Sequence, residues 1–182
     1  MNTLENRRVV YQAIFINPED VAKLIERQGE KLPKEVKDMH CTFKFQPSEA
    51  EIKKFSELLG KDLTLKVVGY CSDGKNSGYE IELSPEQDEA YTNVHSVNSG
   101  KPVPTVEKTT PHITVSMEDG AKAVDTGMLP FSKEGFEPFT IHGKAGFFTS
   151  RMKDKERISE VIYEPVLRES KDTDKTKESQ TK

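Results

Sequence analysis

The sequence predicts an α+β fold built from antiparallel strands and a few helices. Short runs of β-branched and aromatic residues are separated by turn residues, and two stretches show helical spacing of apolar residues. Two neighbouring strand patterns also flank a glycine-containing turn, as in a hairpin. Strands and hairpins interleaved with helices are typical of antiparallel sheets that pack against helices.

The first half of the chain predicts one strand followed by two helices. Residues 9–16 are β-branched and aromatic, which is typical of a strand. In residues 20–28, apolar residues recur at i, i+3 and i+4 and therefore share one helical face. Ser48 and Glu51 have the spacing of a capping box, so a second helix is expected to begin there.

The second half predicts a hairpin, a third helix, a long loop and two closing strands. The strands are expected at residues 63–71, 79–83, 143–149 and 158–163. Ser84 and the proline after it indicate a helix that continues toward Val97. Residues 98–110 contain one glycine and two prolines and are expected to form a loop.

Chain length and composition predict a single domain followed by a tail. With 182 residues the chain is long enough for one domain, which we assign to residues 1–165. Residues 168–182 contain no apolar side chain, so this segment has too little surface to bury to offset the entropy of ordering it. We therefore expect residues 166–182 to be a disordered, charged tail.

Charge and cysteine content exclude several classes of protein. The 27 basic and 31 acidic residues give a net charge of −4, which argues against a basic nucleic-acid coat and against binding of a DNA duplex. No run of 18 apolar residues and no apolar signal segment is present, so neither membrane insertion nor secretion is expected. Cys41 and Cys71 lack metal-ligand spacing. These features predict a cytoplasmic protein, which for a viral chain means the host cytoplasm.

One short pattern occurs twice, as HCTFKF in residues 40–45 and as HITVSM in residues 112–117. Side chains of a strand alternate between two faces, so each copy should present its histidine and the residues two and four positions later on one face. The first copy is therefore predicted to have one polar face formed by His40, Thr42 and Lys44. The second copy is predicted to have one formed by His112, Thr114 and Ser116.

Two such pairs have the chemistry needed to open a phosphodiester. One imidazole can accept the proton of the nucleophile while the other protonates the leaving oxygen. The hydroxyls of Thr42 and Thr114 can donate to the non-bridging oxygens of the phosphate, and Lys44 and Ser116 are further candidates for contacting it. Neither role requires a metal or another cofactor. Which histidine is the base stays open.

The other candidate site residues are assigned binding or structural roles and not catalytic ones. Tyr11 lies on the first strand and is a candidate for stacking on a nucleobase. His95, in the predicted third helix, and His142 lack a hydroxyl two residues later and are assigned to structural or surface roles. A Cys41–His40 nucleophile pair is disfavoured because adjacent strand residues point to opposite faces.

The paired His-x-Thr motifs, about 70 residues apart, resemble those of the 2H phosphoesterase superfamily. The resemblance extends from the first strand to about Phe148. It implies a bilobal, pseudo-symmetric fold in which two antiparallel sheets form a central cleft and helices pack outside. It also implies His40 and His112 as the catalytic pair of a metal-independent phosphodiesterase.

Several substrates are compatible with that resemblance. The expected one is a cyclic oligonucleotide signal, as for the anti-CBASS nucleases of phages, because an acidic body suits a small nucleotide better than extended RNA. RNA ends, opened by a 2′,3′-cyclic phosphodiesterase of RNA repair, are an alternative. A nucleotide-binding module without turnover, and a protein-interaction domain that recruits partners through its tail, also stay open.

Overall fold

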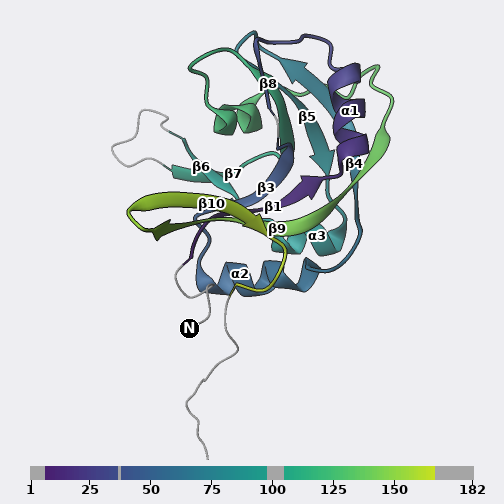
Figure 1. The fold of residues 1–182 in the computed structure, drawn as a ribbon. Helices are drawn as coiled ribbons and strands as arrows, with labels where there is room; N and C mark the ends of the chain where they lie inside the picture. Colours follow the sequence, from purple (N-terminus) through teal and green to yellow (C-terminus); the bar gives the residue numbers. More distant parts are fainter. Residues whose placement is uncertain (1–6, 37, 98–104, 167–182) are drawn as a thin grey trace, which may run out of the picture.

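The computed structural model describes residues 7–36, 38–97 and 105–166. An extensive antiparallel sheet is surrounded by short helices, so the α+β class is confirmed (Figure 1). The predicted tail lies outside the described residues except for Val166. In the described part of the chain, no helix is both long and apolar enough to cross a bilayer.

Eight strands form the main sheet, in the order β2-β8-β5-β4-β9-β1-β3, with β10 pairing with β9. They are β1 (Arg8–Ile16), β2 (Lys34–Glu35), β3 (His40–Phe45), β4 (Leu63–Ser72), β5 (Asn76–Glu82), β8 (His112–Met117), β9 (Phe139–Lys153) and β10 (Glu156–Ile162). A separate two-stranded sheet consists of β6 (Val94–Val97) and β7 (Thr105–Lys108).

Strand β9 joins the two halves of the main sheet. Its first residues pair with β4, and its later residues pair with β1 on one side and β10 on the other. The expectation that two separate sheets form a central cleft is therefore corrected: apart from the small β6–β7 pair, the described strands belong to one sheet. The reason is that β9, with 15 residues, is long enough to pair with strands from both halves. The sheet curls so far that β3 and β8, near opposite ends of its order, contact each other (Figure 1).

Short helices pack around the sheet, and their starts follow the sequence signals. They are α1 (Pro18–Arg27), α2 (Glu49–Phe55), α3 (Pro85–Ala90) and the 3₁₀-helices η2 (Ser56–Leu58) and η3 (Ala123–Met128). The capping box of Ser48 and Glu51 is present at α2, and Ser84 forms a second one with Gln87 at α3. Both boxes satisfy backbone N–H groups that the first helical turn leaves without partners.

The third helix ends earlier than the sequence predicts. After Ala90 the chain becomes extended, and the backbone N–H of Thr92 donates to the carbonyl of Phe43 in β3, 3.0 Å away. His95 consequently lies on β6 and not on a helix. The second strand of this pair, β7, falls inside the segment predicted as a loop. The hydrogen bond to β3 and the pairing of β6 with β7 have overridden the local helical preference here.

Aromatic packing behind β3 fixes the strand that carries the first motif. Phe43 makes edge-to-face contacts with Phe55 of α2 and with Tyr91, at ring separations of 5.3 and 5.4 Å. Phe55 packs in the same way on Phe147 of β9, 5.5 Å away. All four rings are buried, so a rigid apolar layer supports His40 from behind.

A buried carboxylate ties α1 to β9. Asp20 accepts hydrogen bonds from the backbone N–H of His142 (2.7 Å) and from the ring Nδ1 of the same residue (3.2 Å), and Lys23 lies 3.3 Å away. Burial by itself would raise the pKa of Asp20, but the hydrogen bonds from His142 and Lys23 outweigh it and hold that pKa below its usual value. His142 therefore has the structural role that the sequence assigned to it.

We predict that Asp20→Ala lowers the free energy of unfolding by about 2 kcal/mol at neutral pH, because the N–H of His142 loses its buried acceptor. Because the pKa of Asp20 is lower in the folded protein than in the unfolded chain, ionised Asp20 stabilises the fold at pH values above its unfolded-state pKa. This stabilisation is lost as the pH falls through the folded-state pKa. The difference between variant and wild type should therefore narrow in acid. Urea denaturation at neutral and at acidic pH measures it.

Asp62→Ala is the matched control, since Asp62 is exposed and precedes β4. It should leave the unfolding free energy within about 0.5 kcal/mol of wild type. Equal stability of the Asp20→Ala variant and wild type at neutral pH would contradict the proposed tie between α1 and β9.

Candidate active site

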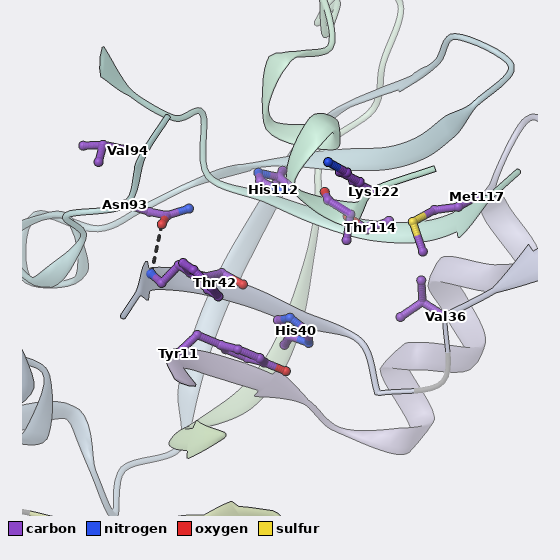
Figure 2. Close-up of a pocket in the computed structure, with 12 residues that line it drawn as sticks. Tyr11, Val36, His40, Thr42, Asn93, Val94, His112, Thr114, Met117 and Lys122 are labelled. Atoms are coloured by element: carbon purple, nitrogen blue, oxygen red, sulfur yellow. Dashed lines mark hydrogen bonds between the residues drawn. The ribbon is translucent and has the colours of Figure 1, made fainter. Parts of the chain in front are cut away.

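Both predicted motifs border one cavity of about 550 Å³. It is lined by Tyr11, Val36, His40, Thr42, Phe45, Asn93, Val94, His112, Thr114, Met117, Lys122 and Ala123. Figure 2 shows Tyr11, His40 and Thr42 along one wall, facing His112, Thr114 and Lys122 along the other. The curl of the sheet thus brings together two motifs that are 72 residues apart in sequence (112 minus 40).

The two imidazoles are held in the same way. The Nδ1 atom of His40 lies 2.7 Å from the carbonyl oxygen of Asp38, and that of His112 lies 2.7 Å from the carbonyl oxygen of Thr110. A carbonyl oxygen can only accept, so Nδ1 is the protonated nitrogen of each neutral ring. Each Nε2 is therefore left with a free lone pair, which is the arrangement that a general base requires.

Burial sets the protonation of both rings. It lowers the pKa of His40 below its ordinary value, against the opposing effects of the Asp38 carbonyl and the negative charge of Asp38. Burial also lowers the pKa of His112, against the Thr110 carbonyl, and the nearby charge of His40 lowers it further. The electrostatic influence of one imidazole on the other indicates that they share one site.

A one-residue bulge at the same position interrupts the alternation of both motif strands. In β3, Thr42 pairs with Ala13 and Lys44 with Gln12, so Phe43 is the extra residue. In β8, Thr114 pairs with Gly78 and Ser116 with Ser77, so Val115 is the extra residue. A bulge shifts the following residue to the other face of the sheet. The fifth residue after each histidine, Phe45 or Met117, lines the cavity instead.

These bulges correct two of the predicted site residues. Lys44 does not line the cavity, and its Nζ lies 3.9 Å from Oε2 of Glu51 in α2. Ser116 is fully buried away from the cavity, where its hydroxyl accepts from the N–H of Leu32 (3.1 Å) and donates to Oε1 of Gln28 (2.9 Å). Both predictions assumed strict alternation, which the extra residue in each strand breaks.

The two threonines line the cavity as the alternation predicts, but their surroundings differ. The Thr114 hydroxyl donates to Oγ1 of Thr126 (2.8 Å) and approaches the carbonyl oxygen of Ala123 (3.3 Å), both in η3. For Thr42 no side-chain hydrogen bond is found among the described residues. The Thr42 hydroxyl can thus donate a hydrogen bond to an oxyanion without rearrangement. The Thr114 hydroxyl must first give up its hydrogen bond to η3.

Tyr11 lines the cavity but is already stacked on protein groups. Its ring lies 4.8 Å from the imidazole of His40 and 5.0 Å from the ring of Phe148, with interplanar angles of 23° and 14°. Burial and the charge of Asp38 raise the pKa of Tyr11 to about 12, so its hydroxyl stays protonated. The ring positions His40, which leaves little of its face for a nucleobase.

Cys41 has the inert position that strand alternation predicts. It is fully buried on the other face of β3, against the backbone N–H of His112. Burial raises the pKa of this thiol to about 12, so it is not a nucleophile at neutral pH. Its contact with β8 helps to hold the two motif strands together.

Asn93 links the two walls of the cavity. Its Oδ1 accepts from the backbone N–H of Phe45 at the end of β3, 3.1 Å away (Figure 2). Its Nδ2 donates to Oγ1 of Thr109 (3.3 Å), three residues before His112. In the described part of the chain, β3 and β8 are not paired as neighbouring strands, so this amide bridges a gap in the sheet. Local sequence patterns around Asn93 give no signal of this role.

Helix η3 closes the cavity beside His112, and the residue just before the helix brings a positive charge to the cavity. A Cβ atom on Gly127 would lie 2.8 Å from Cε1 of His112, so only glycine allows η3 to pack this closely on the ring. Lys122, just before η3, is exposed and lines the cavity, and it takes part in no ion pair among the described residues. No pattern in the sequence indicates Lys122, because only folding brings it to the motifs.

Comparison with known proteins adds no identification, because no family model and no curated protein matches this sequence. The geometry of the described residues is therefore the basis for a functional assignment. Among these residues, no group of three or more histidine, cysteine, aspartate or glutamate side chains is placed to hold a metal ion.

We predict that both imidazoles are Nδ1-protonated when neutral and titrate below the usual histidine pKa of about 6.5. In His40→Ala, the pKa of His112 should rise because the repelling charge is removed, yet stay below the ordinary value because the ring is still buried. Nitrogen-15 NMR of the histidine rings over a pH series measures both the tautomer and the pKa.

An unchanged His112 pKa in the His40→Ala variant would contradict the shared site. So would Nε2-protonated rings, because a carbonyl acceptor at Nδ1 is incompatible with that tautomer.

Proposed function

We propose that this chain is a phosphodiesterase that acts on a nucleotide without a metal ion. The observation that carries the proposal is the matched pair of imidazoles on one cavity, each with Nδ1 donating to a carbonyl and Nε2 free. His40 and His112 are the acid and base of the reaction. The site is consistent with the paired His-x-Thr motifs of 2H phosphoesterases, including their bilobal pseudo-symmetry.

The equivalent bulges support that pseudo-symmetry. Each motif strand has its extra residue three positions after the histidine, so both motifs share a backbone irregularity as well as a sequence pattern. Each histidine also contacts the carbonyl of the residue two positions before it. Two equivalent half-sites of this kind suit a reaction at one phosphorus atom, in which the nucleophile attacks on one side and the leaving oxygen departs on the other.

The reaction needs one proton shared between the two imidazoles. The neutral ring takes the proton of a water molecule or ribose hydroxyl as that oxygen attacks phosphorus, and the protonated ring delivers its proton to the leaving oxygen. Burial lowers the pKa of both rings and so disfavours two charged rings in one cavity. The negative charge of a bound phosphate would favour protonation of one ring and so give the singly protonated pair.

The remaining polar groups stabilise the developing negative charge. Thr42 and Thr114 donate to the non-bridging oxygens of the phosphate, with Thr114 turning from its contact with Thr126 when the anion is bound. Lys122 takes the role that the sequence analysis gave to Lys44 and neutralises charge at the cavity edge. A preorganised donor of this type typically contributes about 10²–10³-fold in rate.

Cavity size favours a small nucleotide as substrate. A volume of about 550 Å³ falls in the usual range for small-molecule pockets and suits a cyclic oligonucleotide better than an extended RNA chain. The acidic net charge of −4 also disfavours a long polyanion. Cleavage of a cyclic oligonucleotide signal in the cytoplasm is therefore our preferred activity, and RNA-end processing is the second candidate.

We predict that His40→Ala and His112→Ala each lower turnover by about 10²-fold or more, because each removes one half of the acid–base pair. The measurement is a product screen by mass over cyclic di- and trinucleotides, 2′,3′-cyclic mononucleotides and RNA ends. Circular dichroism establishes that both variants remain folded.

His142→Ala is the matched control, because its half-exposed ring lies on β9 beside Asp20 and away from the cavity. Turnover near the wild-type rate in either cavity-histidine variant would overturn the assignment. Turnover should also persist in EDTA, and a loss that zinc or manganese restores would identify a metal enzyme. Binding of these compounds without any turnover would indicate a nucleotide-binding module.

A further inference from the structure

Phe45 is an exposed aromatic residue at the edge of the proposed active site. Its side chain is 55% exposed although it lines the cavity that holds His40 and His112. No stacked or edge-to-face contact between Phe45 and another ring occurs among the described residues. A single exposed apolar side chain is ordinary on a protein surface, but this one lies on the wall of the cavity that holds both histidines, where a bound ligand would cover the ring.

The backbone holds Phe45 firmly in this exposed position. The bulge at Phe43 turns Phe45 to the cavity face, and Asn93 accepts a hydrogen bond from its backbone N–H, 3.1 Å away. The next residue, Gln46, has a left-handed conformation (φ 53°) and donates its N–H to the carbonyl of Val10, 2.8 Å away. Exposure of the ring is therefore built into the end of β3.

Phe45 differs in this respect from Tyr11, its neighbour across the β1–β3 pair. The ring of Tyr11 is covered by His40 and Phe148, whereas that of Phe45 has no aromatic neighbour in the described part of the chain. Val94, itself partly exposed, lines the same end of the cavity as Asn93, which holds Phe45 (Figure 2). An aromatic face beside an apolar side chain suits a flat, uncharged ring system.

We propose that Phe45, and not Tyr11, stacks on a nucleobase of the substrate. The proposal rests on the proposed function. Phe45 lines the same cavity as the two histidines and the two threonines, so a base stacked on Phe45 would belong to the substrate whose phosphate those residues bind. Every nucleobase has a π-face, so Phe45 adds affinity and not base selectivity. The base lies on the open end of the cavity while its phosphate reaches Thr42 and the two imidazoles.

The test compares two ligands that differ by a base. Adenosine 5′-monophosphate and ribose 5-phosphate share the sugar and the phosphate, and only the first has a nucleobase. We expect Phe45→Ala to weaken binding of adenosine 5′-monophosphate by about tenfold or more and to leave binding of ribose 5-phosphate unchanged. Phe45→Tyr, which keeps an aromatic face, should retain wild-type affinity. Calorimetric titration at millimolar ligand measures both.

Met152→Ala is the matched control, because Met152 on β9 is equally exposed (56%) and does not line the cavity. It should bind both ligands as wild type does. An equal loss for both ligands in Phe45→Ala would mean that Phe45 only supports the wall of the cavity, and unchanged binding of the nucleotide would overturn the stacking role. Absence of nucleotide binding to the wild type would also overturn it.

The absence of tryptophan from the sequence allows an independent measurement. Phe45→Trp places a single tryptophan, which can be excited apart from the tyrosines, at the proposed stacking position. Adenosine 5′-monophosphate should quench its fluorescence, and ribose 5-phosphate should not. Met152→Trp should respond to neither ligand. These experiments measure binding and not turnover, so they test the stacking role of Phe45 alone. The acid–base roles are tested separately, by the turnover of the histidine variants.

Discussion

The curl of one continuous sheet is the constraint on which the proposed site depends. Strands β3 and β8 lie near opposite ends of the hydrogen-bonded order, and only the twist accumulated across the strands between them brings them into contact. Among the described residues, β3 and β8 are not hydrogen-bonded neighbours in the sheet, and Asn93 and the buried Cys41 thiol connect these two walls of the cavity. Any change that flattens the sheet would separate His40 from His112 without touching either ring.

Local geometry then makes the two halves of the site alike. Each histidine ring is tied through Nδ1 to the carbonyl two residues earlier, and each strand has an extra residue at the same place. The two halves differ in what surrounds them. His40 is stacked on Tyr11, whereas Gly127 of η3 packs directly on His112. The threonines are unequal for the same reason, because η3 already engages the hydroxyl of Thr114.

The pKa values of the two cavity histidines depend on burial more than on nearby carboxylates. Burial lowers the pKa of both imidazoles, and the charge of His40 adds to this effect at His112. Within an acidic protein, Lys122 brings a positive charge to the cavity, and among the described residues no carboxylate pairs with it. Lys44 is instead held by Glu51 of α2. In the function that we propose, the positive charge of Lys122 would attract a phosphate while the rings remain able to exchange a proton.

The amino-acid sequence alone predicts the fold class, the capped starts of α2 and α3, the starts of both motif strands and the central residues of both motifs. These depend on short-range physics: alternation along a strand, capping of a helix, and turn residues in a hairpin. The folded sheet, by contrast, sets the faces that Lys44 and Ser116 occupy, because a bulge arises from pairing with a distant strand. It likewise brought Lys122 and Phe45 to the cavity, since both positions depend on long-range contacts that no local pattern encodes.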